Sequence, residues 1–274
     1  MRVAVCQLNS QDDKEKNLAT AERLVREAAA DKADLIALPE YSEYQGPKDG
    51  AFEAAEAEGG PTTQRFAALA KELDVSILLG SIRIKNSDSD RCSNRSILFG
   101  RDGQINAQYN KLHLYDVDLP GRITYHESDT VQPGSEIVTG EVNGHKVGLS
   151  VCYDVRFPEL YRLQALSGAE ILFVPAAFAL YTGRDHWETL LRARAIENQC
   201  FVIAPGQVGP YPPAGACNGR SMVIDPWGTI LTCMRDDVGY AIADLDFAQQ
   251  TKVREELPAL KNRRDDMYSI SAKS

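Results

Sequence analysis

The chain has 274 residues, with 30 Lys and Arg against 39 Asp and Glu, and a formal net charge of −9. An acidic chain is a poor match for nucleic acid or for an anionic membrane surface, so neither is expected as the main partner. The hydrophobic fraction of 43% and the charged fraction of 25% are ordinary for a globular protein. There is no run of about 18 apolar residues, so no membrane-spanning helix is expected.

Apolar periodicity predicts strands that alternate with helices along most of the chain. In chain order, strands are expected over residues 2–8, 33–40 and 75–84, on both sides of a turn at 101–103, over 145–154, 170–178, 200–208 and 240–246, and in a hairpin around 225–228. Helices are expected over residues 12–30, 62–73, 157–169 and 185–198. The hairpins interrupt the alternation, which predicts one α/β domain over residues 1–274 with mixed sheets.

The N-terminal segment and the cysteines bear on compartment and cofactors. The segment MRVAVCQLNS is too short for a secretory apolar region, which predicts a cytoplasmic protein. Six scattered cysteines without a CxxC pair predict reduced thiols. The four histidines have no Cys or His partner at metal-finger spacing, and neither a Gly-rich phosphate loop nor a GxSxG motif is present. We therefore expect no metal and no cofactor.

Cys152 ends an apolar segment and is followed at once by polar and charged residues, in GLSVCYDVRFPE. A residue at such a strand-to-helix turn lies at the carboxyl edge of a sheet, where sites of α/β proteins form. The backbone N–H groups that open the next helix would favour a thiolate and an oxyanion there. The sequence context fits a nucleophilic thiol and a buried packing cysteine equally well.

Glu40 and Lys111 also follow apolar segments, in ADLIALPE and YNKLHLYD. Taken singly, each is read as a solvated or ion-paired residue at a strand end. His113 shares the face of Lys111 if that segment is extended, and it is either a base or a packed, hydrogen-bonded ring. As a set, a glutamate to take the proton of Cys152 and a lysine to stabilise an oxyanion would support acyl transfer through a thioester. Spacing alone does not place these residues together.

The segments LIALPE, YNKLHLYD and GLSVCYDVRFPEL resemble, in the same order, the three signature segments of the nitrilase superfamily of carbon–nitrogen hydrolases. The resemblance runs along nearly the whole chain. It implies a four-layer α-β-β-α sandwich with mixed sheets, which dimerises by its helices. It also implies Cys152 as nucleophile, Glu40 as base and Lys111 as the cation that stabilises the oxyanion. A second active-site glutamate maps to Glu127.

The segments CYDVRFPEL and 183–209 look like the Nit branch of this superfamily, and KLHLYDVDLPG with HESDTVQPG is similar to deaminated glutathione amidases. This implies thiol-dependent hydrolysis of amide bonds in small carboxylate-bearing molecules, with release of ammonia or an amine. The alternatives within the superfamily are an omega-amidase, an N-carbamoyl amidohydrolase and a nitrilase. A non-catalytic binding protein is disfavoured, because all three reactive residues are present. The implied assembly is a homodimer or a higher even-numbered oligomer.

Three further residues are candidates for binding the substrate. Arg156, four residues after Cys152, is either a fork for a substrate carboxylate or the partner of Asp154 or Glu159. Tyr153 either donates its backbone N–H to the oxyanion or packs. Arg184 opens a predicted helix and would face the pocket, where a basic mouth suits an anionic small molecule.

Overall fold

The computed structural model describes residues 1–121 and 123–272. Its helices are α1 (Lys14–Ala30), α2 (Lys48–Ala54), α3 (Pro61–Leu73), α4 (Pro158–Leu166), α5 (Leu180–Asn198) and α6 (Phe247–Glu256), with the short 3₁₀ helices η1 (Glu127–Asp129) and η2 (Cys152–Arg156). Its strands are β1 (Arg2–Leu8), β2 (Leu35–Ala37), β3 (Ser76–Lys85), β4 (Cys92–Phe99), β5 (Ile105–Asn110), β6 (Asp116–Leu119), β7 (Ile123–His126), β8 (Val131–Gln132), β9 (Thr139–Val142), β10 (His145–Gly148), β11 (Ile171–Phe173), β12 (Phe201–Ala204), β13 (Gly206–Tyr211), β14 (Gly215–Asn218), β15 (Met222–Ile224), β16 (Ile230–Cys233) and β17 (Gly239–Asp244).

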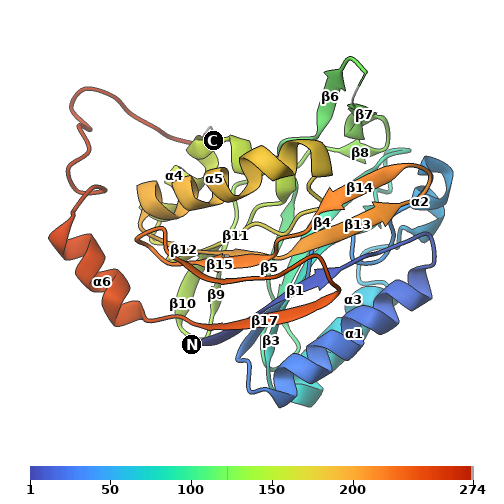
Figure 1. The fold of residues 1–274 in the computed structure, drawn as a ribbon, viewed down its shortest axis with the longest axis horizontal. Coiled ribbons are helices and arrows are strands. Elements are labelled where there is room, and N and C mark those ends of the chain that lie inside the picture. The colour runs from blue at the N-terminus through green and yellow to red at the C-terminus, as the bar shows by residue number, and fades with distance from the viewer. Residues whose placement is uncertain (122, 273–274) are drawn as a thin grey trace.

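Two mixed sheets form the centre of the fold (Figure 1). The larger sheet follows the order β14-β13-β1-β2-β3-β4-β5, with β17 paired to β1 and β8 to β4. The smaller sheet follows the order β16-β15-β12-β11-β10-β9. In both sheets the central strands are parallel and the outer ones antiparallel. Helices α1 and α3 lie along the outer face of the larger sheet, and α4 and α5 lie over the smaller one (Figure 1).

The alternation of side chains along β1 explains why these layers form. Ala4 and Cys6 point to one face and pack in a core with α1 and α3. Val3 and Val5 point to the other face and share a core with Phe173 of the smaller sheet. A strand that is apolar on both faces needs cover on both, which produces the predicted α-β-β-α sandwich with mixed sheets.

Most predicted elements are present, and the differences have local causes. The segment 200–208 is two strands in different sheets, because Pro205 lacks the N–H needed to continue a ladder. The strand predicted over 145–154 ends at Gly148, and further on the Val151 N–H is bound by the Asp154 side chain. Helix α5 begins before Asp185.

Gly183 lies in the first turns of α5, although glycine is unfavourable inside a helix. A Cβ at this position would lie 2.4 Å from the Asn218 side chain, so the glycine permits close packing of α5 on β14. Helices α2 and α6 and the β6–β7 hairpin were not predicted. Among the described residues, no helix is long and apolar enough to cross a membrane, and all six cysteines are free, as predicted.

Candidate active site

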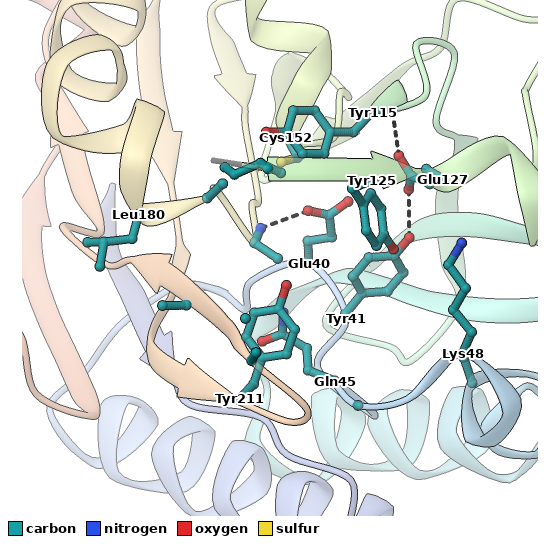
Figure 2. A pocket seen from close by; sticks show the side chains of 18 of the residues that line it. Glu40, Tyr41, Gln45, Lys48, Tyr115, Tyr125, Glu127, Cys152, Leu180 and Tyr211 are labelled. Atoms are coloured by element: carbon teal, nitrogen blue, oxygen red, sulfur yellow. Dashed lines mark hydrogen bonds between the residues drawn. The ribbon is translucent and has the colours of Figure 1, made fainter. Parts of the chain in front are cut away.

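A cavity of about 890 Å³ opens at the carboxyl ends of strands from both sheets. Glu40 follows β2, Lys111 follows β5 and Cys152 follows β10, and all three line this cavity together with Glu127 at the start of η1. Figure 2 shows Glu40, Glu127 and Cys152 in the cavity. The two sheets face each other, so residues far apart in the sequence meet at one edge. The structure therefore brings together the four residues that were predicted to carry the chemistry.

Lys111 lies between two carboxylates. Its Nζ is 3.0 Å from Glu40 Oε1 and 2.8 Å from Glu127 Oε2, and its side chain is only 2% exposed. Burial disfavours the charge, but the Glu127 and Glu40 carboxylates outweigh burial and hold the pKa of Lys111 well above its ordinary value. Lys111 is therefore a fixed cation at the floor of the cavity.

Glu40 is held by hydrogen bonds on both carboxylate oxygens. Oε1 accepts from Asn94 Nδ2 at 2.8 Å as well as from Lys111, and Oε2 accepts from the backbone N–H of Ala177 at 2.7 Å. The Glu40 backbone carbonyl accepts from Gln207 Nε2 at 2.9 Å. These contacts leave the carboxylate one orientation, which faces the cavity (Figure 2).

Glu127 is the more completely bound of the two glutamates. Oε1 accepts from the Tyr41 hydroxyl at 2.6 Å and from Asn94 Nδ2 at 3.1 Å. Oε2 accepts from the Tyr115 backbone N–H at 2.7 Å and from Lys111. Burial raises the pKa of Glu127, but Lys111 and these donors outweigh it and lower the pKa. Glu127 is thus an anion that fixes Lys111.

Cys152 occupies a bent stretch of backbone between β10 and α4. Its φ is +52°, in the left-handed region, and its N–H donates to the Pro175 carbonyl at 2.8 Å. Burial and then the Glu40 carboxylate raise the pKa of the thiol well above its ordinary value, against the opposing effect of Lys111. The backbone N–H of Cys152 itself is thus occupied by Pro175, and a thiolate favoured by the other neighbouring amides stays a prediction.

The outer wall of the cavity comes from loops and helix ends, and it carries several cations and tyrosines. Lys48 pairs with Asp129 at 2.6 Å, and the buried Arg83 pairs with Glu43 at 3.1 Å. Arg184, on α5, is exposed and forms no ion pair with any residue in the described part of the chain. Tyrosines 41, 115, 125, 181 and 211 also line the cavity.

Arg156, Tyr153 and His113 lie beside the cavity and are not among its lining residues. The Arg156 guanidinium lies over the Tyr153 and Phe178 rings and contacts His186 Nδ1 at 3.2 Å, so neither of its predicted acidic partners binds it. The His113 ring stacks on Phe157 with the centroids 3.7 Å apart, which matches the packed alternative. Substrate binding by Arg156 and Tyr153 stays a prediction.

Sequence reasoning missed Tyr41, Asn94 and Lys48. Tyr41 directly follows Glu40, and its φ of +54° is unusual for a bulky residue, which the sequence does not reveal. Asn94 is fully buried in β4, where a polar residue inside an apolar strand was an available signal. Lys48 lies in a polar loop and start of helix with no pattern that separates it from other surface lysines.

Comparison with known proteins places this site in a family. Residues 2–255 match the carbon-nitrogen hydrolase family. Deaminated glutathione amidase of Synechocystis sp. is 40% identical over 263 residues, covering 95% of this chain and 97% of that protein. Omega-amidase NIT2 of Mus musculus is 37% identical over 274 residues, covering 99% and 98%.

The nitrilase and fragile histidine triad fusion protein NitFhit of Caenorhabditis elegans is 38% identical over 271 residues, covering 98% of this chain. This chain spans only 62% of the length of that fusion protein. The crystal structure of NitFhit superposes with a TM-score of 0.94 and covers 100% of this chain and 68% of the compared chain. The matches in sequence and fold agree with the resemblance carried by the three signature segments. The chain therefore belongs to the carbon–nitrogen hydrolase family.

Proposed function

We propose that the chain is an amidase in which Cys152 is the nucleophile, Glu40 the proton carrier and Lys111 the cation that stabilises the oxyanion. The observation that supports this most directly is the buried Glu40 carboxylate at the floor of one cavity, which binds the Lys111 ammonium at 3.0 Å and raises the pKa of the Cys152 thiol. A thiol, a base and a cation in one site are the groups that acyl transfer through a thioester needs.

In the first step, Glu40 takes the proton of Cys152 as the sulfur attacks the amide carbonyl carbon. A carbon–sulfur bond forms, and the carbonyl π electrons move to the oxygen. Lys111 and a backbone N–H stabilise that oxyanion. The N–H of Cys152 already donates to Pro175, so we assign the backbone donor to Tyr153, the next residue in η2.

In the second step, the carbon–nitrogen bond breaks and Glu40 gives its proton to the leaving nitrogen. Ammonia or an amine departs and a thioester remains on Cys152. Water then attacks the thioester, with its proton passing to Glu40, and the acid product leaves as the thiol is restored. Glu127 transfers no proton, and its role is to hold Lys111 in place.

The substrate that we propose is deaminated glutathione, in which a keto group replaces the amino group of glutathione. The support is the 40% identity to the Synechocystis enzyme of that name and a cavity wall that presents Lys48 and Arg184 to a substrate with carboxylates at both ends. Omega-amidase activity, on α-ketoglutaramate, is the second candidate, because the mouse omega-amidase covers 99% of the chain at 37% identity.

The two candidates differ in their leaving groups, which gives a direct test. Hydrolysis of deaminated glutathione releases α-ketoglutarate and cysteinylglycine, whereas hydrolysis of α-ketoglutaramate releases α-ketoglutarate and ammonia. We would measure kcat/KM for both compounds, for an N-carbamoyl amino acid and for an aliphatic nitrile. The control variants are Cys152→Ala and Cys233→Ala, which removes an exposed thiol outside the cavity. A higher kcat/KM for deaminated glutathione that requires Cys152 would support the proposal, and a higher value for another compound would replace it.

We also propose that the chain works as a homodimer. The support is a group of exposed apolar side chains on α5 and the β15–β16 hairpin, where Trp227 is 61% exposed, Ile196 48% and Leu231 39%. Light scattering of the wild type and of Ile196→Glu would test this, and a wild-type monomer at micromolar concentration would contradict it.

A further inference from the structure

Asp154 is a fully buried carboxylate two residues after Cys152, and no step of the proposed reaction uses it. Unlike Glu40 and Glu127, it is not part of the cavity lining. No lysine or arginine pairs with it in the described part of the chain, and its ring partner is His113. A buried carboxylate is costly unless its oxygens accept hydrogen bonds, so its donors indicate what it holds.

The two oxygens of Asp154 bind both segments that carry the reactive groups. Oδ2 accepts from the Val151 N–H at 2.8 Å, on the residue before Cys152. The same oxygen accepts from the Tyr109 hydroxyl at 2.8 Å. Oδ1 accepts from the His113 N–H at 3.0 Å and lies 2.7 Å from His113 Nδ1, whose N–H must donate because a carboxylate only accepts.

Tyr109 and His113 are each two residues from Lys111, one on either side. The Tyr109 hydroxyl also accepts from the Leu112 N–H at 3.1 Å, which closes a small network around the turn that follows β5. One carboxylate therefore ties the turn around Lys111 to the turn around Cys152. The thiol turn also contains the left-handed Cys152, a strained conformation that persists only where its surroundings enforce it.

We propose that Asp154 is a positioning residue, which sets the placement of Cys152 relative to Lys111 by binding the backbone on both sides. The inference rests on the proposed function, in which these two residues act on the same carbonyl group. Asp154 touches neither the substrate nor a reacting atom. It fixes the distance between the attacking sulfur and the cation that stabilises the oxyanion, and this geometry is needed in the transition state more than in the bound substrate.

Replacement by asparagine keeps the size of the side chain and changes its hydrogen bonding. In asparagine an NH2 group replaces one carboxylate oxygen. This NH2 group would face either the Val151 N–H and the Tyr109 hydroxyl or the two N–H groups of His113, which are all donors. We expect Asp154→Asn to lower kcat about 100-fold and to change KM by less than about threefold, because a displacement near 1 Å costs about that much in rate. A purely structural role would lower the melting temperature without this division between kcat and KM.

The experiment compares Asp154→Asn with Asp225→Asn in the full-length chain, with deaminated glutathione and α-ketoglutaramate as substrates. Asp225 is a matched control, because it is also a buried aspartate that accepts backbone N–H groups, from Trp227 and Thr229, but does not line the cavity. The melting temperature, kcat, KM and the rate of Cys152 alkylation by iodoacetamide are measured for each variant. A low kcat and an altered alkylation rate in Asp154→Asn alone would support the inference.

Tyr109→Phe keeps the ring and removes one donor, so it serves if Asp154→Asn does not fold. We expect a fall in kcat of about fivefold with KM retained, as for the loss of one hydrogen bond. An unchanged kcat in the folded variants would overturn the inference, as would equal losses in the Asp225 control. The proposed function fails separately, if Cys152→Ala retains activity.

Discussion

The floor and the wall of the cavity differ in how they are built. The floor consists of Glu40, Lys111, Glu127 and Cys152, which are 1%, 2%, 1% and 7% exposed, and ion pairs tie Lys111 to both glutamates. The wall comes from loops and from the start of α5, where Arg184 is exposed. Ion pairs hold Lys111 and the two glutamates of the floor in place, whereas Arg184 in the wall remains in contact with water.

This difference assigns separate tasks to the two regions. A buried ion network is preorganised, so it can stabilise charge that develops during the reaction without rearranging. An exposed cation in the wall contributes to binding but is screened by water and salt. Changes at the floor should therefore affect rate and stability, and changes in the wall should affect substrate affinity alone. The following predictions test that separation.

The largest expected effect is that of Cys152→Ala. Loss of the proposed nucleophile should lower kcat by at least about 1,000-fold, as for nucleophiles of other acyl-transfer enzymes. The melting temperature should stay near that of the wild type, because no charge is removed and the φ of +52° remains. Steady-state kinetics and calorimetry measure both effects. Residual activity within tenfold of the wild type would exclude the proposed mechanism.

Lys111→Met should damage both activity and stability. Without the ammonium, the Glu40 and Glu127 carboxylates face each other in a buried site, and breaking a buried ion pair typically costs about 3–5 kcal/mol. Urea denaturation at neutral pH measures this loss. The pKa of Glu127 is lowered in the folded wild type, so its ion pair stabilises the wild type above the unfolded carboxyl pKa and is lost in acid. The gap between wild type and variant should therefore narrow as the pH falls.

The double variant Lys111→Met, Glu127→Gln provides the control for that interpretation. It removes one carboxylate with the cation, so it should regain part of the stability but none of the activity. If the double variant were no more stable than Lys111→Met, the loss would come from packing and not from uncompensated charge.

Glu40→Gln separates the effect of Glu40 on the pKa of the Cys152 thiol from its proposed role in carrying the proton of that thiol. Its carboxylate raises the pKa of Cys152, so its removal should shift alkylation of Cys152 by iodoacetamide to lower pH. Amide hydrolysis should nevertheless fall by about 100-fold or more, because the proposed proton carrier is lost. Mass spectrometry of alkylated Cys152 against pH, together with kcat, tests both parts. A shift of the alkylation profile to higher pH would contradict this account of the thiol.

The difference between the floor and the wall of the cavity also explains how far the sequence could predict this site. Glu40, Lys111 and Cys152 each follow an apolar strand, and strand ends collect at one edge of a sheet, so their meeting follows from the periodicity once the sheets are known. Arg156 was predicted from its distance in sequence to Cys152, but the bend at η2 takes its side chain to the rings of Tyr153 and Phe178.

The wall was less predictable because loop conformation depends on tertiary contacts. Lys48, the first residue of α2, lines the cavity and is held by Asp129, a residue 81 positions away. Asn94 binds both Glu40 and Glu127 from the middle of a strand. A polar residue in a buried strand indicates that a partner exists, but the identity of the partner depends on the strands that pair around it.

Arg184→Ala should have the smallest effect and affect binding alone. Loss of a charged hydrogen bond to a substrate carboxylate should raise KM about tenfold with kcat retained, and the increase should shrink at high salt because the side chain is exposed. Arg192→Ala is the matched control, an exposed arginine on the same helix that pairs with Glu188 and does not line the cavity. Equal KM values for the two variants would mean that the wall does not recognise the carboxylate through Arg184. A fall in kcat instead would mean that floor and wall are not separate, because a residue in contact with water would then control the position of the buried groups.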